Sequence, residues 1–208
     1  QQQLYADRRI GDRWPAIADA LEAVGHARIR QMLTVGGSVG PLIGGFDLPL
    51  ALLALGASVT VAGAGGRRTL SLEEAFDKRF ARDEMVVSVS VPPPAAGGSA
   101  FYKYLARGVL EIPTVNTAAV VRLDAQGRCA QARVCVGSVS WKPIVLDLAA
   151  LAGQMPTEDA VRAAVQPVRA AAQPLSDVRG SAAYKREMAV EFAARAVMTA
   201  FRRAQQNH

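Results

Sequence analysis

The sequence predicts an α+β fold made of two units, each combining antiparallel strands with helices, in a chain of 208 residues. Two observations carry this prediction. Strand patterns and helix patterns follow one another in blocks, twice, without the β-α-β alternation of a doubly wound sheet. Between the blocks, residues 92–99 read PPPAAGGS, a run of prolines and small residues that is typical of a linker and unsuited to a sheet.

The first unit opens with a predicted helix over residues 14–25, where Pro15 suits the first turn and Gly25 can end it. A glycine-rich stretch, TVGGSVGPLIGGFDLP over residues 34–49, follows as a loop. Asp47 stands where a helix cap is expected, ahead of a second, strongly apolar helix.

A hairpin and a further strand complete the first unit. Residues 57–63 and 67–72 flank the tight sequence AGAGG, which is a hairpin signal. Residues 73–76 predict a short helical turn, and residues 84–92 alternate as a strand.

The second unit is predicted to contain four antiparallel strands followed by two helices. The strands are expected at residues 99–106, 115–124, 129–139 and 141–149, with a hairpin turn at 123–128. The helices are expected at residues 156–173, capped by Thr157, and at residues 181–204. Apolar residues cover a wide face of the last helix, so it is expected to pack on more than one neighbour. They are Tyr184, Met188, Phe192 and Ala196, with Val190, Val197 and Phe201 beside them.

Composition and charge exclude several classes of function. The chain is 50% hydrophobic and 20% charged, as in an ordinary globular protein. Its net charge is +6, but the arginines are scattered singly and only 6% of residues are aromatic, a pattern that disfavours nucleic-acid binding. A basic surface suits an acidic partner subunit or an anionic cofactor. No apolar run approaches the ~20 residues that span a bilayer, and no signal peptide is expected at the N-terminus.

The only cysteines, Cys129 and Cys135, fall in one predicted strand. Extended chain would place them roughly 20 Å apart on the same face, whereas a disulfide needs Cα atoms within about 7 Å. Two cysteines also cannot ligate an iron–sulfur cluster. We expect two half-buried strand residues in a reducing compartment.

No stand-alone catalytic constellation is found. Neither His26 nor His208 belongs to a metal-spaced cluster, so a histidine-based triad or metal site is not expected. The GAG within residues 62–66 lacks the third glycine of a dinucleotide fingerprint, because Arg68 stands there and a strand follows. If the chain takes part in catalysis, a cofactor must carry the chemistry.

Two interpretations of residues 34–49 are open from the residues alone. Consecutive glycines let backbone N–H groups approach an anion, Thr34 and Ser38 add hydroxyls, and Asp47 can accept from a sugar hydroxyl. Alternatively, the glycines only turn the chain and Asp47 only caps its helix.

Several motifs recur in an order that points to one family. Ile29-Arg30 precede Thr34-Val35-Gly36-Gly37-Ser38, and Asp47 with Pro49 then opens an apolar helix. Later, EMVVSVSVP is followed by AFYK, and SDVRGSAAYKREMAVEFAARAV leads into the last helix. Over about residues 15–204, the chain resembles the FAD-binding (medium) subunits of the xanthine dehydrogenase and carbon monoxide dehydrogenase family of molybdenum hydroxylases.

The resemblance implies both a fold and a function. Residues 1–97 would form the second subdomain of a PCMH-type FAD-binding domain, and residues 98–208 a CO dehydrogenase flavoprotein C-terminal-like domain. The protein would be a cytoplasmic flavoprotein subunit of a molybdenum hydroxylase-type oxidoreductase. It would assemble with a molybdopterin-binding large subunit and a [2Fe–2S] small subunit, neither cofactor lying on this chain. Electrons would pass from the clusters through FAD to an acceptor such as NAD, a quinone or oxygen.

The resemblance also assigns site residues. Those expected at the FAD diphosphate are Thr34, Val35, Gly36, Gly37 and Ser38. Asp47 would hold a ribityl or ribose hydroxyl, Val87 would line the flavin, and Lys103 would lie near its ring. From its strand pattern alone, Lys103 reads equally as a solvated lysine. Trp141 is expected in the core or at a subunit interface, and Asp177 and Arg179 as cap and surface residues of the last helix, without a catalytic role.

The chain departs from the family pattern around residues 40–44, which read GPLIG. Polar groups that the family places at the positions of Pro41 and Ile43 are gone, and the segment between Phe76 and Glu84 is short. The resemblance begins inside the second subdomain, so the family's first subdomain, with its own phosphate loop, is expected to be missing from this chain. These departures favour a competing interpretation, a flavin-free structural and docking module of such a complex.

Overall fold

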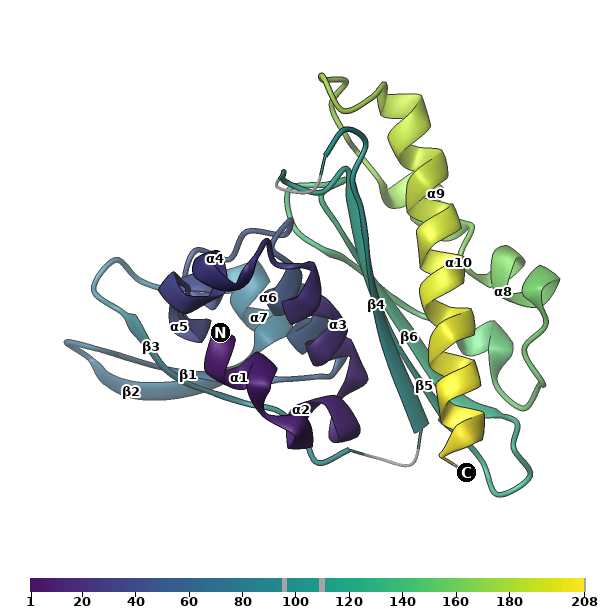
Figure 1. Cartoon of the computed structure of the whole chain (residues 1–208), viewed down its shortest axis with the longest axis horizontal. Helices are drawn as coiled ribbons and strands as arrows, with labels where there is room; N and C mark the ends of the chain where they lie inside the picture. The colour runs from purple at the N-terminus through teal and green to yellow at the C-terminus, as the bar shows by residue number, and fades with distance from the viewer. Residues whose placement is uncertain (95–96, 109–110, 208) are drawn as a thin grey trace.

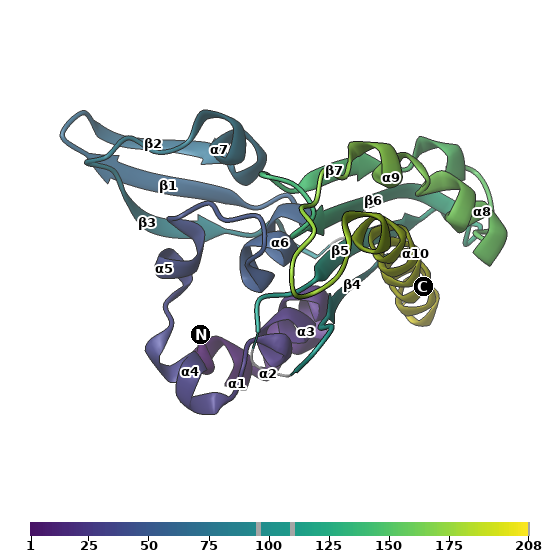
Figure 2. The same ribbon diagram turned by 90° about the horizontal axis from the view of Figure 1, so that it is seen from above.

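The structure is a computed structural model that describes residues 1–94, 97–108 and 111–207. Two antiparallel sheets lie side by side with helices around them (Figures 1 and 2). The small sheet has the strand order β2-β1-β3 and the large sheet has the order β4-β5-β6-β7. The sequence therefore predicted the α+β class and the antiparallel pairing correctly.

The first unit is mostly helical before its sheet begins. Its elements are α1 (Gln2–Ala6), α2 (Arg8–Arg13), α3 (Pro15–Ala23), α4 (Ala27–Met32), α5 (Val35–Val39), α6 (Asp47–Ala54), β1 (Ser58–Gly63), β2 (Gly66–Ser71), α7 (Leu72–Lys78) and β3 (Met85–Ser90). The hairpin predicted at AGAGG joins β1 to β2, with Gly63 paired to Gly66. Helices α1 and α2 were not predicted.

The second unit places one long helix against its sheet. Its elements are β4 (Gly97–Tyr104), β5 (Val115–Leu123), β6 (Cys129–Gly137), β7 (Ile144–Asp147), the 3-10 helix η1 (Ala149–Leu151), α8 (Glu158–Ala164), α9 (Pro167–Ala171) and α10 (Ala182–Gln206). Helix α10 crosses one face of β4 and β5 and also contacts α8 and α9 (Figure 1). The wide apolar face of this helix thus has the several neighbours that were expected.

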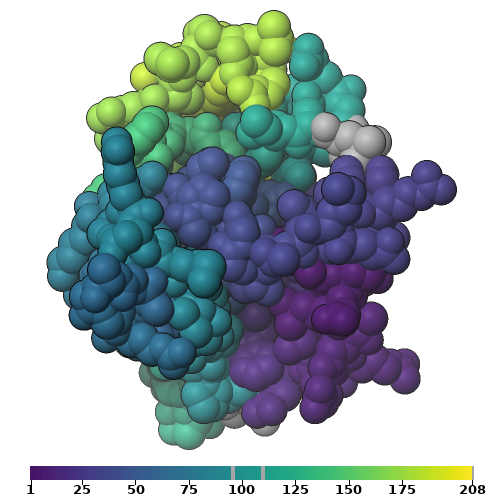
Figure 3. All heavy atoms as spheres, turned by 90° about the vertical axis from the view of Figure 1, so that its left-hand side faces the viewer, coloured from purple at the N-terminus to yellow at the C-terminus, as the bar shows by residue number. Residues whose placement is uncertain are grey.

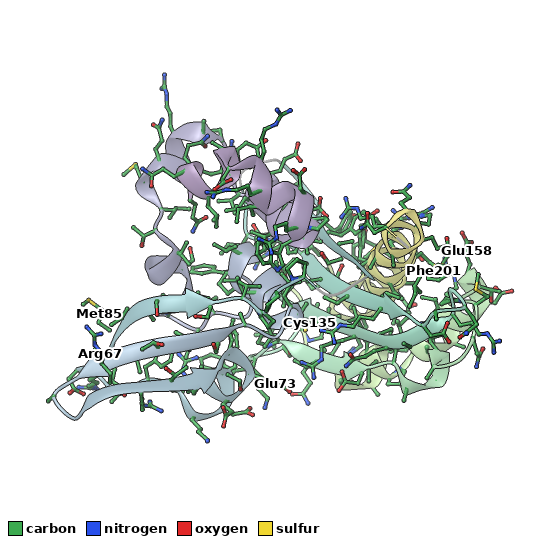
Figure 4. The ribbon with its side chains drawn as sticks, turned by 90° about the horizontal axis from the view of Figure 1, so that it is seen from below. Arg67, Glu73, Met85, Cys135, Glu158 and Phe201 are labelled. Atoms are coloured by element: carbon green, nitrogen blue, oxygen red, sulfur yellow. The ribbon has the colours of Figure 1, made fainter. Side chains whose placement is uncertain are left out.

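The two units share a hydrophobic core. Helix α6 is buried along its whole length and packs on α3, β5 and β6, which explains why its sequence is apolar on every side. Phe101, Ala118 and Cys135 of the large sheet belong to the same cluster of buried residues as the leucines of α6. The opposite face of the large sheet packs under α10, where Phe201 lies (Figure 4). One face of the large sheet therefore packs against the first unit and the other face packs against α10, so the sheet lies between the two hydrophobic cores.

Three local expectations were wrong. The glycine-rich loop is in part the short helix α5, capped by Thr34. Asp47 does not cap α6: it lies in the first turn, after the N-cap Phe46, and its side chain bonds elsewhere. The single helix expected at residues 156–173 is two helices, because Pro167 cannot continue the hydrogen bonds of α8.

The two cysteines do not share a face of β6. A bulge where the partner strand passes from Arg122 to Leu123 shifts the register, so Cys129 points into the core under α10 while Cys135 points into the core around α6. One extra residue in a strand reverses the facing of everything beyond it. Both thiols are free and fully buried rather than half-buried.

The predicted linker is shorter than expected. Residues 95–96 lie outside the described residues, but residues 97–99 already belong to β4. Gly98 permits this, because a Cβ there would lie 2.1 Å from the carbonyl oxygen of Ala200 on α10. Gly98 of the linker therefore allows the strand to pack closely under the helix. Within the described part of the chain, no helix is long and apolar enough to cross a membrane.

Candidate functional site

Six of the eight residues expected to bind the cofactor line two neighbouring pockets, and Val35 and Val87 line neither. Thr34, Gly36 and Gly37 line a pocket of about 590 Å³ together with residues 79–81 and β3, here called the glycine pocket. Ser38, Asp47 and Lys103 line a pocket of about 300 Å³, here called the Asp47 pocket. Residues 34–49 contribute to both pockets, and Figure 3 shows this segment in blue-violet between the purple N-terminal helices and the small sheet.

Helix α5 begins at the edge of the glycine pocket. The side-chain oxygen of Thr34 accepts the N–H of Gly37 at 2.8 Å and so caps the helix. The amides of Val35 and Gly36 precede the helix's own hydrogen bonds, and no other described residue accepts from them. Two donors suited to an anion are therefore present where a diphosphate group was expected.

The two consecutive glycines have different roles. A Cβ on Gly37 would lie 2.8 Å from the oxygen of Thr34 that caps the helix, so a side chain there disturbs the helix itself. A Cβ on Gly36 would meet Val86 only at 3.7 Å or more, an ordinary contact. The fold itself tolerates a side chain at Gly36. A glycine is therefore needed there only if a ligand in the pocket approaches the backbone closely. The residues present thus fit a cradle for a phosphate group.

Arg79 is a residue of the glycine pocket that sequence reasoning missed. Its guanidinium donates to the carbonyl oxygens of Leu42 at 2.9 Å and Pro41 at 3.1 Å. Arg79 therefore holds the backbone of residues 40–44, the segment in which the chain departs from the family pattern. Arg79 adds a positive charge to a lining that also contains Glu84, whose carboxylate is paired with Arg68. The sequence signal was weak, because a lone arginine after a helix is usually a surface residue.

Asp47 and Lys103 form an ion pair across the two units. Lys103 Nζ donates to Asp47 Oδ2 at 2.8 Å and to the carbonyl oxygen of Ala23 at 3.1 Å. Only 10% of the lysine side chain and 7% of the aspartate side chain are exposed. The interpretation of Lys103 as a solvated lysine is therefore wrong.

Burial raises the pKa of the Asp47 carboxyl above its ordinary value, while Lys103 and a hydrogen bond from Asn116 act in the opposite direction. Asn116 is the second residue that sequence reasoning missed. It is completely buried in β5 and donates through Nδ2 to Asp47 Oδ1 at 3.2 Å. A polar side chain inside an apolar strand was the available signal, although nothing in the sequence named its partner.

Ser38 is buried beside the Asp47 pocket and is already hydrogen-bonded. The side-chain amide of Gln1 donates to Ser38 Oγ and, at 3.0 Å, to the carbonyl oxygen of Thr34. A ligand group that uses the hydroxyl of Ser38 has to share it with this amide or displace it.

Val87 is not brought together with the other expected residues. It lies in β3 with 45% of its surface exposed and lines neither of the two pockets. Its neighbour Val86 lines the glycine pocket instead, because successive side chains of a strand point to opposite faces.

The remaining expectations concern residues outside the pockets. Asp177 does not cap α10, whose N-cap is Ser181. Instead Asp177 pairs with Arg179 and with the buried Lys185, each at 2.7 Å, and these hydrogen bonds hold the pKa of its carboxyl well below the usual range. Trp141 is 89% exposed, so it does not lie in the core, and its place at a subunit interface stays a prediction. Among the described residues, no group of three His, Cys, Asp or Glu side chains is arranged to hold a metal ion.

Two family models together match nearly the whole chain. The FAD binding domain in molybdopterin dehydrogenase matches residues 1–94. The CO dehydrogenase flavoprotein C-terminal domain matches residues 100–200.

Known proteins align over the same extent. The 6-hydroxypseudooxynicotine dehydrogenase complex subunit alpha of Paenarthrobacter nicotinovorans is 28% identical over 97% of this chain and 70% of its own length. The carbon monoxide dehydrogenase medium chain of Hydrogenophaga pseudoflava is 29% identical over 98% of this chain and 72% of its own length. A solved structure of carbon monoxide dehydrogenase from Hydrogenophaga pseudoflava superposes with a TM-score of 0.90 at 29% identity, covering 97% of this chain and 72% of that one.

Proposed function

Because the chain belongs to the FAD-binding medium subunits of the molybdenum hydroxylase family, we propose that it holds FAD at the two pockets and serves as an electron conduit. The chain is an oxidoreductase subunit, and FAD is the cofactor of its family. The observation that carries the proposal is the buried Asp47–Lys103 pair, which lines a pocket beside the glycine-rich helix α5.

Each candidate residue has a role in this proposal. Thr34 to Ser38 bind the diphosphate, with the amides of Val35 and Gly36 as donors and the hydroxyl of Ser38 beside them. Asp47 accepts from a ribityl or ribose hydroxyl. Lys103 keeps the carboxylate of Asp47 charged and in place, and lies near the flavin ring. Val87 is proposed to line the flavin from the face of β3 opposite Val86, outside the two pockets.

The chemistry supplied by bound FAD is the relay of electrons from iron–sulfur clusters to an acceptor such as NAD, a quinone or oxygen. The clusters belong to a [2Fe–2S] small subunit and the molybdopterin to a large subunit, both of which we propose as partners. The relatives are themselves described as a complex subunit and as medium chains, which supports an assembly of this kind. The proposal also includes the cytoplasm as location, and a division of the chain into residues 1–97 and 98–208.

The competing function is a flavin-free structural and docking module. Two observations favour it. The side chains of Pro41 and Ile43 offer no polar group to a cofactor, and Arg79 occupies the carbonyl oxygens of Pro41 and Leu42. In addition, the hydroxyl of Ser38 already accepts from Gln1.

A substitution at Gly36 separates the two functions. In Gly36→Ala the new methyl group makes only ordinary contacts in the fold but occupies the approach to the amides of α5. We expect the full-length protein, purified with its partner subunits, to lose most of its flavin while keeping its thermal stability. The matched control is Gly65→Ala, which places a methyl group in open space on the hairpin. Equal flavin content in both variants would show that the amides of α5 do not hold the cofactor.

A further inference from the structure

A row of three residues crosses the large sheet beneath the Asp47 pocket. Lys103 of β4 pairs with Asn116 of β5, and Asn116 pairs with Gly137 of β6. Adjacent strands place such partners side by side with their side chains on one face. The backbone of Gly44 to Asp47, which belongs to the first unit, rests on this face.

Each member of the row has a different part in the contact. Lys103 carries the positive charge that pairs with Asp47. Gly137 supplies empty space, since a Cβ there would lie 2.1 Å from the carbonyl oxygen of Gly44. Asn116 supplies two hydrogen bonds from one amide, to the carbonyl oxygen of Gly45 and to Asp47 Oδ1, both at 3.2 Å.

The orientation of the Asn116 amide is itself fixed. Ser138 Oγ donates to Asn116 Oδ1 at 3.2 Å, so the oxygen faces Ser138 and the NH₂ group faces Asp47. Ser138 has a φ of 67°, a left-handed conformation that disfavours residues with a side chain. The backbone keeps this costly conformation at the place where the hydroxyl meets Asn116.

We propose that Asn116 is a positioning residue for FAD binding, which sets the orientation of the Asp47 carboxylate; this inference rests on the proposed function. The two oxygens of Asp47 have separate holders, Lys103 on Oδ2 and Asn116 on Oδ1. With both oxygens held, the plane of the carboxylate is fixed and its remaining lone pairs are presented to the pocket. Lysine alone would leave the carboxylate free to rotate about its single partner.

A positioning role and a purely structural role of Asn116 predict different effects of substitutions on FAD binding and on stability. Asn116→Asp is nearly isosteric, but it replaces the donor with a second carboxylate beside Asp47. Two carboxylates at this distance repel, and one takes up a proton more readily. A protonated Asp at this position again donates to Asp47. We therefore expect Asn116→Asp to weaken FAD binding about tenfold or more near pH 8, and to recover as the pH falls toward 6.

A second variant remains informative if Asn116→Asp folds poorly. Ser138→Gly relieves the left-handed backbone and removes the hydroxyl that orients the amide. We expect unchanged or higher thermal stability together with weaker FAD binding. A residue that only stabilises the fold would move both quantities in the same direction.

Two controls match the site, the first in burial and the second in its place between the two units. Thr117→Val removes a buried hydroxyl on the other face of the same strand, where it donates to the carbonyl oxygen of Phe192. Arg203→Met breaks a different ion pair between the units, 2.6 Å from Asp19, without touching the Asp47 pocket. Both controls are expected to keep the FAD dissociation constant and its dependence on pH.

The experiment is an FAD titration of the full-length protein with its partner subunits, from pH 6 to pH 8, alongside thermal unfolding. Weakened binding in Asn116→Asp and Ser138→Gly, with recovery at low pH in the former and no change in the controls, supports the proposal. An unchanged dissociation constant in both variants overturns it. If Asp47→Asn and Lys103→Met also leave the dissociation constant unchanged, the flavin site itself is wrong. If only those two weaken binding, the role of Asn116 alone is refuted.

Discussion

Replacing Lys103 by methionine tests how strongly the two units are joined at the Asp47 pocket. The substitution keeps the length of the side chain and removes the charge that faces Asp47 at 2.8 Å. Removing one partner of a buried ion pair typically costs about 3–5 kcal/mol of unfolding free energy, because an uncompensated charge is left inside the protein.

The Asp47 carboxyl can limit this cost by taking up a proton, so the predicted loss of stability depends on pH. Burial already raises the pKa of Asp47 from an ordinary value of 3.8, and losing Lys103 raises it further. A carboxyl whose pKa is higher in the folded protein than in the unfolded chain stabilises the fold at pH values below its unfolded pKa. This contribution is lost as the pH rises through the folded pKa. Protonating the carboxyl costs about 1.4 kcal/mol for each pH unit above 3.8. The penalty in Lys103→Met is therefore at most about 4 kcal/mol near pH 7 and about 1.6 kcal/mol near pH 5.

Urea unfolding of the wild type and the variant near pH 7 and pH 5 measures both numbers. The control is Lys78→Met, which removes an exposed partner of Glu74 on α7 and is expected to cost less than about 1 kcal/mol at either pH. The double variant Lys103→Met with Asp47→Leu is expected to regain much of the loss, because no unpaired charge remains. A loss below about 1 kcal/mol that does not change with pH would refute the buried pair.

Three further predictions follow from burial and packing. Burial raises the pKa of the Cys135 thiol to about 12, so iodoacetamide should label neither cysteine in the folded protein and both in urea; labelling at the rate of a free thiol would contradict the burial. Hydrogen bonds from Arg68 and a backbone amide lower the pKa of Glu84 from 4.5 to about 2, so its stabilising effect is present above pH 4.5 and fades toward pH 2, where Glu84→Gln and the wild type should unfold alike. Gly98→Ala should lower the unfolding free energy by about 1–3 kcal/mol relative to Gly65→Ala, since a methyl group at Gly98 meets the backbone of α10 while one at Gly65 meets nothing; equal urea midpoints would refute that close approach.

Features with a strong local signal were predictable from the sequence. The hairpin followed from AGAGG, and the strands of the large sheet followed from their alternation. Helix α10 was placed within two residues at its end, since Ser181 gives a clear cap and the apolar face is long. In each case the information lies within a few residues of the element.

Features set by distant contacts were not predictable. Two glycines oppose a helix by about 1 kcal/mol each, yet α5 forms because Thr34 caps it and β3 packs against it. Cys129 lies on the other face of β6 from the one expected, because of a bulge that no turn residue in the sequence indicates. Asn116 meets Asp47 across 69 residues of chain, and Lys103 meets it across 56. The sequence motifs therefore predicted part of the site, whereas the contact of Asn116 with Asp47 could be found only in the folded chain.

The visible absorption spectrum of the full-length protein, purified together with its partner subunits, tests the central claim most directly. The account predicts flavin bands at close to one FAD for each medium subunit, bleached by dithionite and lost in Asp47→Asn. An assembled complex that contains no flavin would contradict it, and the chain would then be a docking module that keeps the fold without the cofactor.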